Sequence, residues 1–200
     1  MDVTEYPFVF FPVGLNLKDR RCVVIGNDRE ALEKERALRE VGARTERIAD
    51  PADVRDAQLA DAFFVISTPQ DEAFSARLRV LADKHRFLLT TIDQPRYGFV
   101  AMQAIAKAGP VRIAISTGGI SPRVGAALRA ALQASLDATF VRFMDCLNAQ
   151  RQRNRLRLDD AETRRGAMRE AAAGFDVDVN VRYPRWFEER GPLGPEVPPG

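Results

Sequence analysis

The stretch Arg21-Cys22-Val23-Val24-Ile25-Gly26 decides the fold of this chain. A short apolar run ends there in a glycine, and Asn27 and Asp28 then offer a helix N-cap before a helical pattern over 29–41. Apolar residues recur at spacings of three and four in that pattern, and Gly42 follows as a stop signal. The stretch therefore predicts a strand, a tight turn and a helix in direct succession.

The residues that follow repeat this alternation of strand and helix. Apolar runs predict strands over 45–48, 62–67 and 87–92, with helical patterns over about 51–59 and 71–84 between them. Two more strands are predicted over 97–105 and 111–116, joined by a turn at Gly109-Pro110. Such an alternation is typical of an α/β protein with a mostly parallel sheet.

The C-terminal part of the sequence changes from alternating to all-helical. Ser121 and Pro122 supply an N-cap and a proline at the first helical position, and an unbroken amphipathic helix is predicted over 123–148. Its apolar face suits packing against a partner or a second copy, and a further helix is expected over about 159–173. The proline- and glycine-rich segment 191–200 is predicted to be a disordered tail.

Composition and charge narrow the classes of partner. The 200 residues are 46% hydrophobic, and 30 Lys and Arg against 28 Asp and Glu leave a net charge of +2. That balance does not indicate a nucleic-acid partner. No apolar stretch approaches the ~18 residues of a membrane span. The N-terminus also lacks the positive charge of a signal peptide. We therefore expect no membrane association and a cytoplasmic location.

The sequence offers no metal-ligand set. Cys22 and Cys146 are far apart and belong to no CxxC pair, so both are expected to be packed or partly buried thiols in a reducing setting. The single histidine, His85, stands at the end of a predicted helix beside two basic residues. A cation at a helix C-terminus is the better interpretation of His85 than a metal ligand.

The turn after the first predicted strand is a candidate cofactor site. A dinucleotide fold needs Gly-x-Gly-x-x-Gly or Ala there, because the backbone has to approach the pyrophosphate at the second glycine. Here the turn reads Gly26-Asn27-Asp28-Arg29-Glu30-Ala31, so the first and third positions conform while the second carries a carboxylate. A carboxylate repels a phosphate at close range. The spacing alone leaves both NAD binding and a plain strand-to-helix turn open.

Several motifs together resemble a known family. The segment 11–26, Phe-Pro-Val-Gly-Leu-Asn-Leu-Lys-Asp-Arg-Arg-Cys-Val-Val-Ile-Gly, closely resembles the opening of the siroheme synthase N-terminal module, the precorrin-2 dehydrogenase and sirohydrochlorin ferrochelatase family. The resemblance continues through 42–44, 66–68, 91–95 and 115–122, and it covers roughly 12–148. Its most specific part is the Thr-Gly-Gly-Ile-Ser-Pro element at the head of the long predicted helix.

The resemblance implies a fold and an activity. It implies a Rossmann-like domain, placed here at 1–116, and a dimerisation and helical region at 117–190 that makes a homodimer. The family oxidises the tetrapyrrole precorrin-2 with NAD to sirohydrochlorin, and many members also insert ferrous iron. Its acid/base residue falls on Asp93, where a carboxylate could accept protons in either reaction. The alternative is that Asp93 only forms an Asx turn before Pro95.

The resemblance also assigns binding residues. It places the NAD cofactor against the following residues: Gly26, Asn27, Asp28, Ala31 and Thr68. It places the tetrapyrrole at the glycine loop formed by Thr117, Gly118, Gly119 and Ser121, with Arg96, Arg112 and Arg123 as candidate carboxylate clamps. A plain glycine turn and solvated surface arginines are the alternatives at these positions.

The sequence departs from the family where the cofactor would bind. The glycine run of the family is replaced by Gly26-Asn27-Asp28 here. The segment between Ile48 and Ala62 is too short for the usual crossover helix and third strand. Phe74 stands near the position where the family has an asparagine. Three hypotheses stay open. The first is an NAD-dependent dehydrogenase, with or without chelatase activity, in which Asp28 is turned aside from the cofactor. The second is a chelatase that has lost NAD binding, and the third is a non-catalytic protein that binds a tetrapyrrole or a protein partner.

Overall fold

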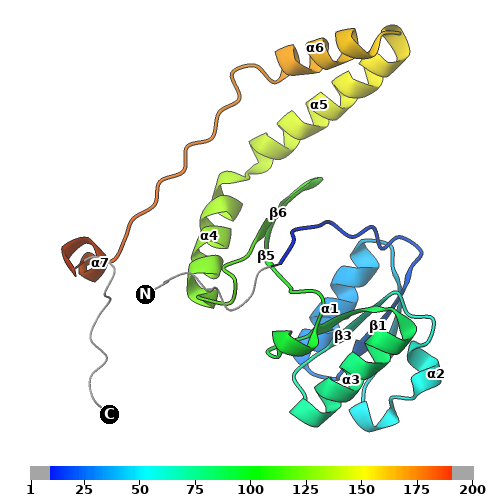
Figure 1. Cartoon of the computed structure of the whole chain (residues 1–200). Coiled ribbons are helices and arrows are strands. Elements are labelled where there is room, and N and C mark those ends of the chain that lie inside the picture. Colours follow the sequence, from blue (N-terminus) through cyan, green and yellow to red (C-terminus); the bar gives the residue numbers. More distant parts are fainter. Residues whose placement is uncertain (1–9, 191–200) are drawn as a thin grey trace. The chain divides into compact units, whose positions relative to one another are not determined.

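Four parallel strands in the order β2-β1-β3-β4 form the main sheet of the computed structural model, which describes residues 10–190. The elements of this part, shown in Figure 1, are β1 (Arg21–Ile25), α1 (Arg29–Glu40), β2 (Arg44–Ile48), a 3-10 turn (Pro51–Asp53), α2 (Asp56–Leu59), β3 (Phe64–Ser67), α3 (Glu72–His85) and β4 (Leu88–Thr91). The Rossmann-like α/β prediction and its trimmed sheet are confirmed, because a single short turn and α2 connect β2 to β3.

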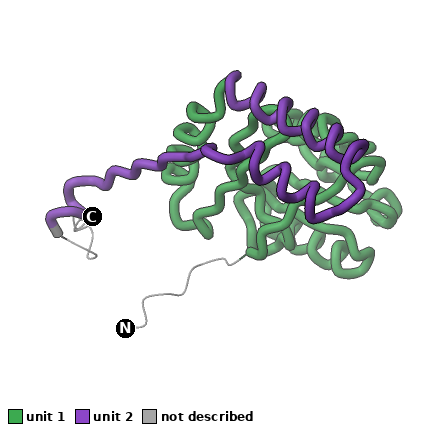
Figure 2. The backbone as a smooth tube through the Cα atoms, turned by 90° about the horizontal axis from the view of Figure 1, so that it is seen from above, with its two compact units in different colours: residues 1–137 green, residues 138–200 purple. Residues whose placement is uncertain are grey.

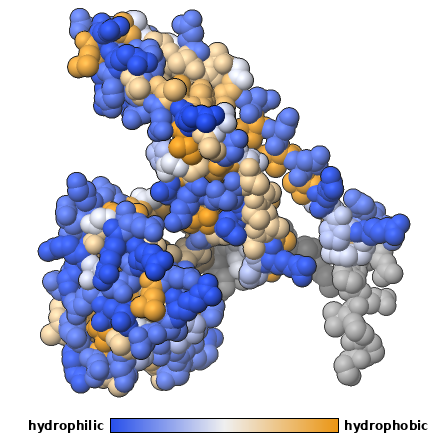
Figure 3. Space-filling view, turned by 180° about the vertical axis from the view of Figure 1, so that it is seen from behind, coloured by the Kyte–Doolittle hydropathy of each residue, from blue (hydrophilic) through white to orange (hydrophobic). Residues whose placement is uncertain are grey.

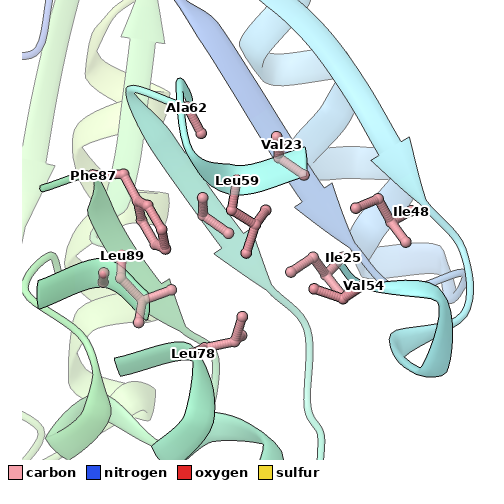
Figure 4. Close-up of a cluster of buried hydrophobic side chains, with 11 residues drawn as sticks. Val23, Ile25, Ile48, Val54, Leu59, Ala62, Leu78, Phe87 and Leu89 are labelled. Atoms are coloured by element: carbon pink, nitrogen blue, oxygen red, sulfur yellow. The ribbon is translucent and has the colours of Figure 1, made fainter. Parts of the chain in front are cut away.

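The two faces of the sheet hold two separate cores. Side chains alternate along β1, so Val23 and Ile25 pack on the face that also holds Leu59 of α2 and Leu78 of α3 (Figure 4). Cys22 and Val24 point to the other face, where they meet Ala31 and Leu38 of α1. Burying one such aliphatic side chain contributes about 1.5–3 kcal/mol. The continuous apolar run of β1 is therefore explained by burial on both faces.

The cysteine and histidine positions are only partly as predicted. Cys22 is buried in β1, and burial raises the pKa of its thiol. Cys146 is exposed, so the prediction of a packed or partly buried thiol is wrong for that residue. His85 ends α3 as expected, and its ring faces the carboxylate of Asp56 on α2. Hydrogen bonds from Lys84 and then from His85 lower the pKa of Asp56.

The strands after β4 form a separate antiparallel hairpin. β5 (Ala104–Ala108) and β6 (Val111–Ile115) pair with each other around the predicted Gly109-Pro110 turn. The predicted strand over 97–105 is wrong over 97–103, because Tyr97 ends a 3-10 turn (Pro95–Tyr97) and 98–103 are irregular. The reason lies in β4: the N–H groups of Phe99 and Val100 both bind the carbonyl of Leu89, so this segment crosses β4 instead of extending the sheet.

The predicted single helix over 123–148 is also wrong, because two helices replace it. α4 (Pro122–Ser135) begins at the Ser121 cap and ends before Leu136, and α5 (Ala138–Arg157) begins after Asp137. The hydroxyl of Ser135 donates to the carbonyl of Ala131 at 3.2 Å, a bond that competes with the helical backbone. Aspartate likewise favours helix starts over helix interiors.

The chain divides into two compact units, Met1–Asp137 and Ala138–Gly200 (Figure 2). The first therefore includes α4, which the sequence had led us to group with the C-terminal region. In the second, α6 (Ala161–Ala171) packs on α5, and an extended segment leads to α7 (Arg185–Arg190), which the sequence did not predict. The predicted disordered tail at 191–200 lies outside the described residues.

Candidate functional site

The turn between β1 and α1 has the close packing that its first glycine predicts. Gly26 has φ +132°, and a Cβ atom there would lie 2.1 Å from Oγ1 of Thr68 and 3.5 Å from the Cβ of Ala31. No L-residue with a side chain fits this position without displacing Thr68. The buried Thr68 thus stands against the turn, at the crevice between the carboxyl ends of β1 and β3 where such sheets bind ligands.

The second position of the turn does not fit a dinucleotide. Asp28 is the N-cap of α1, and its Oδ1 accepts a hydrogen bond from the Ala31 N–H at 2.7 Å. Asn27 is held beside it, because its Oδ1 accepts from Nη1 of Arg47 at 2.7 Å. The carboxylate takes up an amide that a pyrophosphate would use and puts a negative charge at the same helix end. Asp28 is therefore not turned aside.

A cavity of about 990 Å³ opens elsewhere in the first unit. Its walls come from α1, from the end of β4 and the loop after it, from the hairpin and from the start of α4. The polar residues that line it are Glu30, Lys34, Glu72, Thr90, Thr91, Asp93, Gln94, Arg96, Ser116 and Thr117. The predicted NAD residues, Gly26, Asn27, Asp28, Ala31 and Thr68, are not among those that line it.

Asp93 faces this cavity with a free carboxylate. It follows β4 directly and has φ +62°, a left-handed conformation that aspartate tolerates better than most residues. Among residues 10–190 its side chain has no hydrogen bond and no ion pair, so it does not form the Asx turn that the alternative required. The turn is closed instead by Thr91, whose Oγ1 donates to the Gln94 carbonyl at 2.6 Å.

Gln94 adds an acceptor that is buried without a donor. Its Nε2 donates to the Gln70 carbonyl at 2.8 Å, which fixes the orientation of the amide and ties the loop after β4 to the loop after β3. Its Oε1 is buried and has no partner among the described residues, and Gln94 is one of the residues that line the cavity. A buried acceptor without a donor is costly. A bound molecule with an N–H group would remove that cost.

Two basic side chains line the cavity, and each forms an ion pair with an acidic residue nearby. Nζ of Lys34 lies 3.3 Å from Glu30 within α1, and Arg96 pairs with Glu72 at the start of α3. Both are accessible to an incoming anion that could exchange with the acid partner. Ion pairs at such exposed positions are weak, about 0–1 kcal/mol, so exchange costs little.

The glycine loop is at the cavity, but the structure brings only some of the predicted residues there. Thr117 and Gly119 line the cavity, whereas Gly118 and Ser121 lie in the same loop without lining it. The hydroxyl of Ser121 is engaged as the N-cap of α4, where it accepts from Val124. The N–H of Gly118 donates to Ser116 at 3.3 Å.

Two of the three candidate arginine clamps are not brought to the cavity. Arg112 donates through Nη1 to the carbonyls of Gly109 and Val111, at 2.6 and 2.8 Å, so it supports the hairpin turn. Arg123 is exposed near the start of α4 and does not line the cavity either. Only Arg96 of the three lies beside Asp93.

Lys34 and Gln94 are cavity residues that sequence reasoning missed. Gln94 stands next to Asp93 in the motif that carried the resemblance, and this adjacency could have drawn attention to it. Lys34 carried no such signal, because its place at the cavity depends on how the loop after β4 lies along α1.

Comparisons with known proteins bear on the fold. A family model described as putative NAD(P)-binding matches residues 13–104. A siroheme synthase of Thioalkalivibrio sulfidiphilus is 29% identical over 175 residues, which cover 78% of this chain and 36% of that protein. Over this range the chain is similar to the N-terminal module of the siroheme synthases. A siroheme synthase of Xylella fastidiosa is 29% identical over 184 residues, covering 82% of this chain and 38% of that family member.

The chain thus spans little more than a third of the length of the curated siroheme synthases that it matches. A solved structure, of SirC, a precorrin-2 dehydrogenase, superposes with a TM-score of 0.66 at 19% identity, covering 80% of this chain and 88% of that one. That likeness shows the shared fold.

Neither a metal-ligand cluster nor a membrane-spanning helix occurs among the described residues. Over 10–190, no group of three or more His, Cys, Asp and Glu side chains is arranged to hold a metal ion. No helix in that range is long and apolar enough to cross a bilayer.

Proposed function

We propose that the protein is an enzyme of siroheme biosynthesis that binds a precorrin-2-type tetrapyrrole in the cavity around Asp93. The observation that carries this proposal is the free carboxylate of Asp93, which faces a cavity of about 990 Å³ at the carboxyl end of β4. That volume is at the upper end of small-molecule sites, as a macrocycle requires. The names of the siroheme synthase relatives support the same pathway.

The residues around Asp93 suit the groups of such a substrate. A tetrapyrrole presents N–H groups at its centre and carboxylates at its rim. The Oε1 of Gln94 lacks a donor that a pyrrole N–H could supply. Arg96 and Lys34 can meet rim carboxylates by exchanging their acid partners. Asp93 would then accept a proton from the bound macrocycle as general base.

The first candidate reaction is the oxidation of precorrin-2 to sirohydrochlorin with NAD. It rests on the family, whose matching model is described as putative NAD(P)-binding, and on the precorrin-2 dehydrogenase with the same fold. Because Asp28 occupies the start of α1, we assign no step of this reaction to the turn after β1. A homodimer formed through region 117–190 stays a prediction.

One observation favours a second candidate, in which the tetrapyrrole site works without NAD. The Asp28 carboxylate bonds the Ala31 amide at 2.7 Å, where a cofactor phosphate would bind. In that case the protein would insert ferrous iron, as a substrate, into sirohydrochlorin, with Asp93 accepting the pyrrole protons that the metal displaces. A protein that binds the tetrapyrrole without turnover is the further possibility that this observation leaves.

Binding of the tetrapyrrole is tested by titrating the protein with sirohydrochlorin and following its absorption under anaerobic conditions. The unmodified protein should bind it, and Gln94→Leu should bind about tenfold more weakly, because one hydrogen bond to a buried acceptor is lost. Gln152→Leu, on an exposed position of α5, is the matched control and should bind normally. Absence of binding, or equal binding by all three proteins, would overturn the proposed site.

The two candidate reactions are separated by an equilibrium titration with NAD. Binding by the unmodified protein would support the dehydrogenase. No binding, restored by the double substitution Asn27→Gly and Asp28→Gly, would support the reaction without NAD.

A further inference from the structure

A second cavity lies between α5 and α6, wholly within residues 138–200. Its volume is about 500 Å³, and its walls include two arginines from each helix: Arg151 and Arg155 of α5, and Arg164 and Arg165 of α6. The spacing of four residues places Arg151 and Arg155 on one face of α5. Four arginine residues therefore line one cavity.

Acids do not neutralise this cluster. Over 149–169 the sequence holds seven arginines and three acids. Arg165 pairs with Glu162 at 3.1 Å, and Arg164 donates to two backbone carbonyls just after α5. Within residues 10–190, the side chains of Arg151 and Arg155 have neither an ion pair nor a hydrogen bond. Like charges held together in this way are mutually unfavourable unless an anion joins them.

The wall between the two helices contains a buried donor without an acceptor. Asn154 is only 7% exposed, and its Oδ1 accepts from Nε2 of Gln150 at 2.9 Å. Oε1 of Gln150 in turn accepts from Arg153 at 2.7 Å, which fixes the orientation of both amides. Nδ2 of Asn154 is left without a partner among the described residues.

We propose that the cavity between α5 and α6 binds a small polyanion that carries phosphate or carboxylate groups. Arg151 and Arg155 supply planar forks that pair with two oxygens of such a group. An oxyanion, directly or through one bound water, also supplies the acceptor that Nδ2 of Asn154 lacks. The site lies in the second unit and does not depend on the function proposed for the Asp93 cavity.

The test is calorimetric titration of the full chain with inorganic pyrophosphate and, separately, with citrate. Arg151→Gln and Arg155→Gln should each weaken binding about tenfold or more, because each removes a charge-assisted hydrogen bond. Arg157→Gln is the matched control, since Arg157 ends the same helix without lining the cavity. Binding of pyrophosphate alone would assign a phosphate ligand, and binding of citrate alone a carboxylate ligand.

Asn154→Leu distinguishes a loss of binding from a loss of folding. It keeps the size of the side chain and removes the unpaired donor together with the oxygen that accepts from Gln150, so the variant should still unfold cooperatively on heating while polyanion affinity falls. No binding of either probe at millimolar concentration would overturn the proposal. Equal binding by the arginine variants and the Arg157→Gln control would overturn it as well, since that pattern indicates unspecific attraction.

A different observation concerns the extended segment 175–183. Apolar and polar residues alternate strictly along Phe-Asp-Val-Asp-Val-Asn-Val-Arg-Tyr, as on a strand, and Figure 3 shows this alternation between α6 and α7. Every apolar residue of it is half or more exposed. Within residues 10–190 no backbone group of 178–183 has a hydrogen bond. Phe175 stacks on Phe143 at 5.3 Å, which ties the start of the segment to α5.

The order of residues in this segment is self-complementary. Two copies paired antiparallel about Val179 would face each other as Phe175 with Tyr183, Asp176 with Arg182, Val177 with Val181, Asp178 with Asn180, and Val179 with itself. The valines and aromatic residues would share one face, and each Asp176 would meet an arginine on the other. We infer that segment 175–183 pairs with the same segment of a second copy as a symmetric two-stranded ribbon.

The ribbon is tested by disulfide trapping in full-length protein in which the exposed Cys146 is first replaced by serine. Under a mild oxidant Val179→Cys should cross-link, because residues opposite each other in antiparallel strands have Cβ atoms about 4.5–5.5 Å apart. Val177→Cys alone should not, since two such cysteines would be about 14 Å apart at ~3.4 Å per residue. A two-stranded ribbon is marginal alone, so the yield should rise with protein concentration.

Charge reversal distinguishes this register from random collision. In the Val179→Cys background, Asp176→Arg should lower the cross-linking yield about tenfold through two like-charge pairs. Adding Arg182→Asp should restore it, because the opposite charges face each other again. Equal cross-linking yields for Val177→Cys and Val179→Cys, or a yield that charge reversal leaves unchanged, would overturn the inference.

Discussion

Replacing Asp28 separates its two effects, as a helix cap and as a charge. The carboxylate accepts from the Ala31 N–H at 2.7 Å, so Asp28→Ala should destabilise the protein by about 1 kcal/mol, the usual value of an N-cap. Asp28→Asn retains a capping acceptor and should leave the free energy of unfolding nearly unchanged. Both substitutions remove the negative charge. Two unit charges about 4 Å apart repel by about 1 kcal/mol in water and about 4 kcal/mol near a protein surface.

Because Asp28 is exposed, the smaller value applies, and either substitution should strengthen NAD binding about fivefold. Urea unfolding and an equilibrium NAD titration on the same three proteins provide the measurements. The expected pattern is a stability loss in Asp28→Ala only and a gain in NAD affinity in both variants. If Asp28→Asn bound NAD no better than the unmodified protein, the carboxylate would not be what opposes the cofactor, and the reasoning would fail.

Two other predictions concern stability. Gly26→Ala places a Cβ 2.1 Å from Oγ1 of Thr68 at a φ of +132°. Urea unfolding should therefore show a free energy of unfolding lower by about 1–3 kcal/mol. Unchanged stability would contradict the close packing of the turn. Hydrogen bonds from Lys84 and His85 lower the pKa of Asp56, so its contribution to stability is present above the unfolded pKa and is lost as pH falls through the folded value. Thermal unfolding temperatures measured from pH 6 to pH 2.5 should fall less steeply in Asp56→Asn, and an identical slope in both proteins would count against this pair.

The elements of the parallel sheet could be predicted from the sequence because each rule acted locally. The apolar run of β1, the Asp28 cap and the Gly42 stop lie within about twenty residues, and an apolar strand followed by a capped helix recurs at β3 and α3. The break between α4 and α5 was missed, because the apolar spacing continues through Leu136 even though the backbone does not. The strand predicted over 97–105 failed because its backbone groups bind across β4 instead.

The candidate site was predictable only in part, because a cavity is made by segments distant in sequence. Asp93 and the loop with Thr117 and Gly119 followed from the motifs, and the structure brings them to one cavity. The role of Arg112 in the hairpin turn could not be read from its proximity to those motifs. The unpaired acceptor of Gln94 becomes visible only when every neighbour of its amide is placed.

Anaerobic turnover of tetrapyrrole by the unmodified protein and by Asp93→Asn tests the central proposal most directly. Precorrin-2 is supplied with NAD, and sirohydrochlorin with ferrous iron, and product formation is followed by absorption. The proposed role of Asp93 predicts turnover above the spontaneous rate in at least one reaction, lowered about 10²-fold or more in Asp93→Asn, as for loss of a general base. Equal rates in both proteins, or no turnover of either substrate, would contradict it.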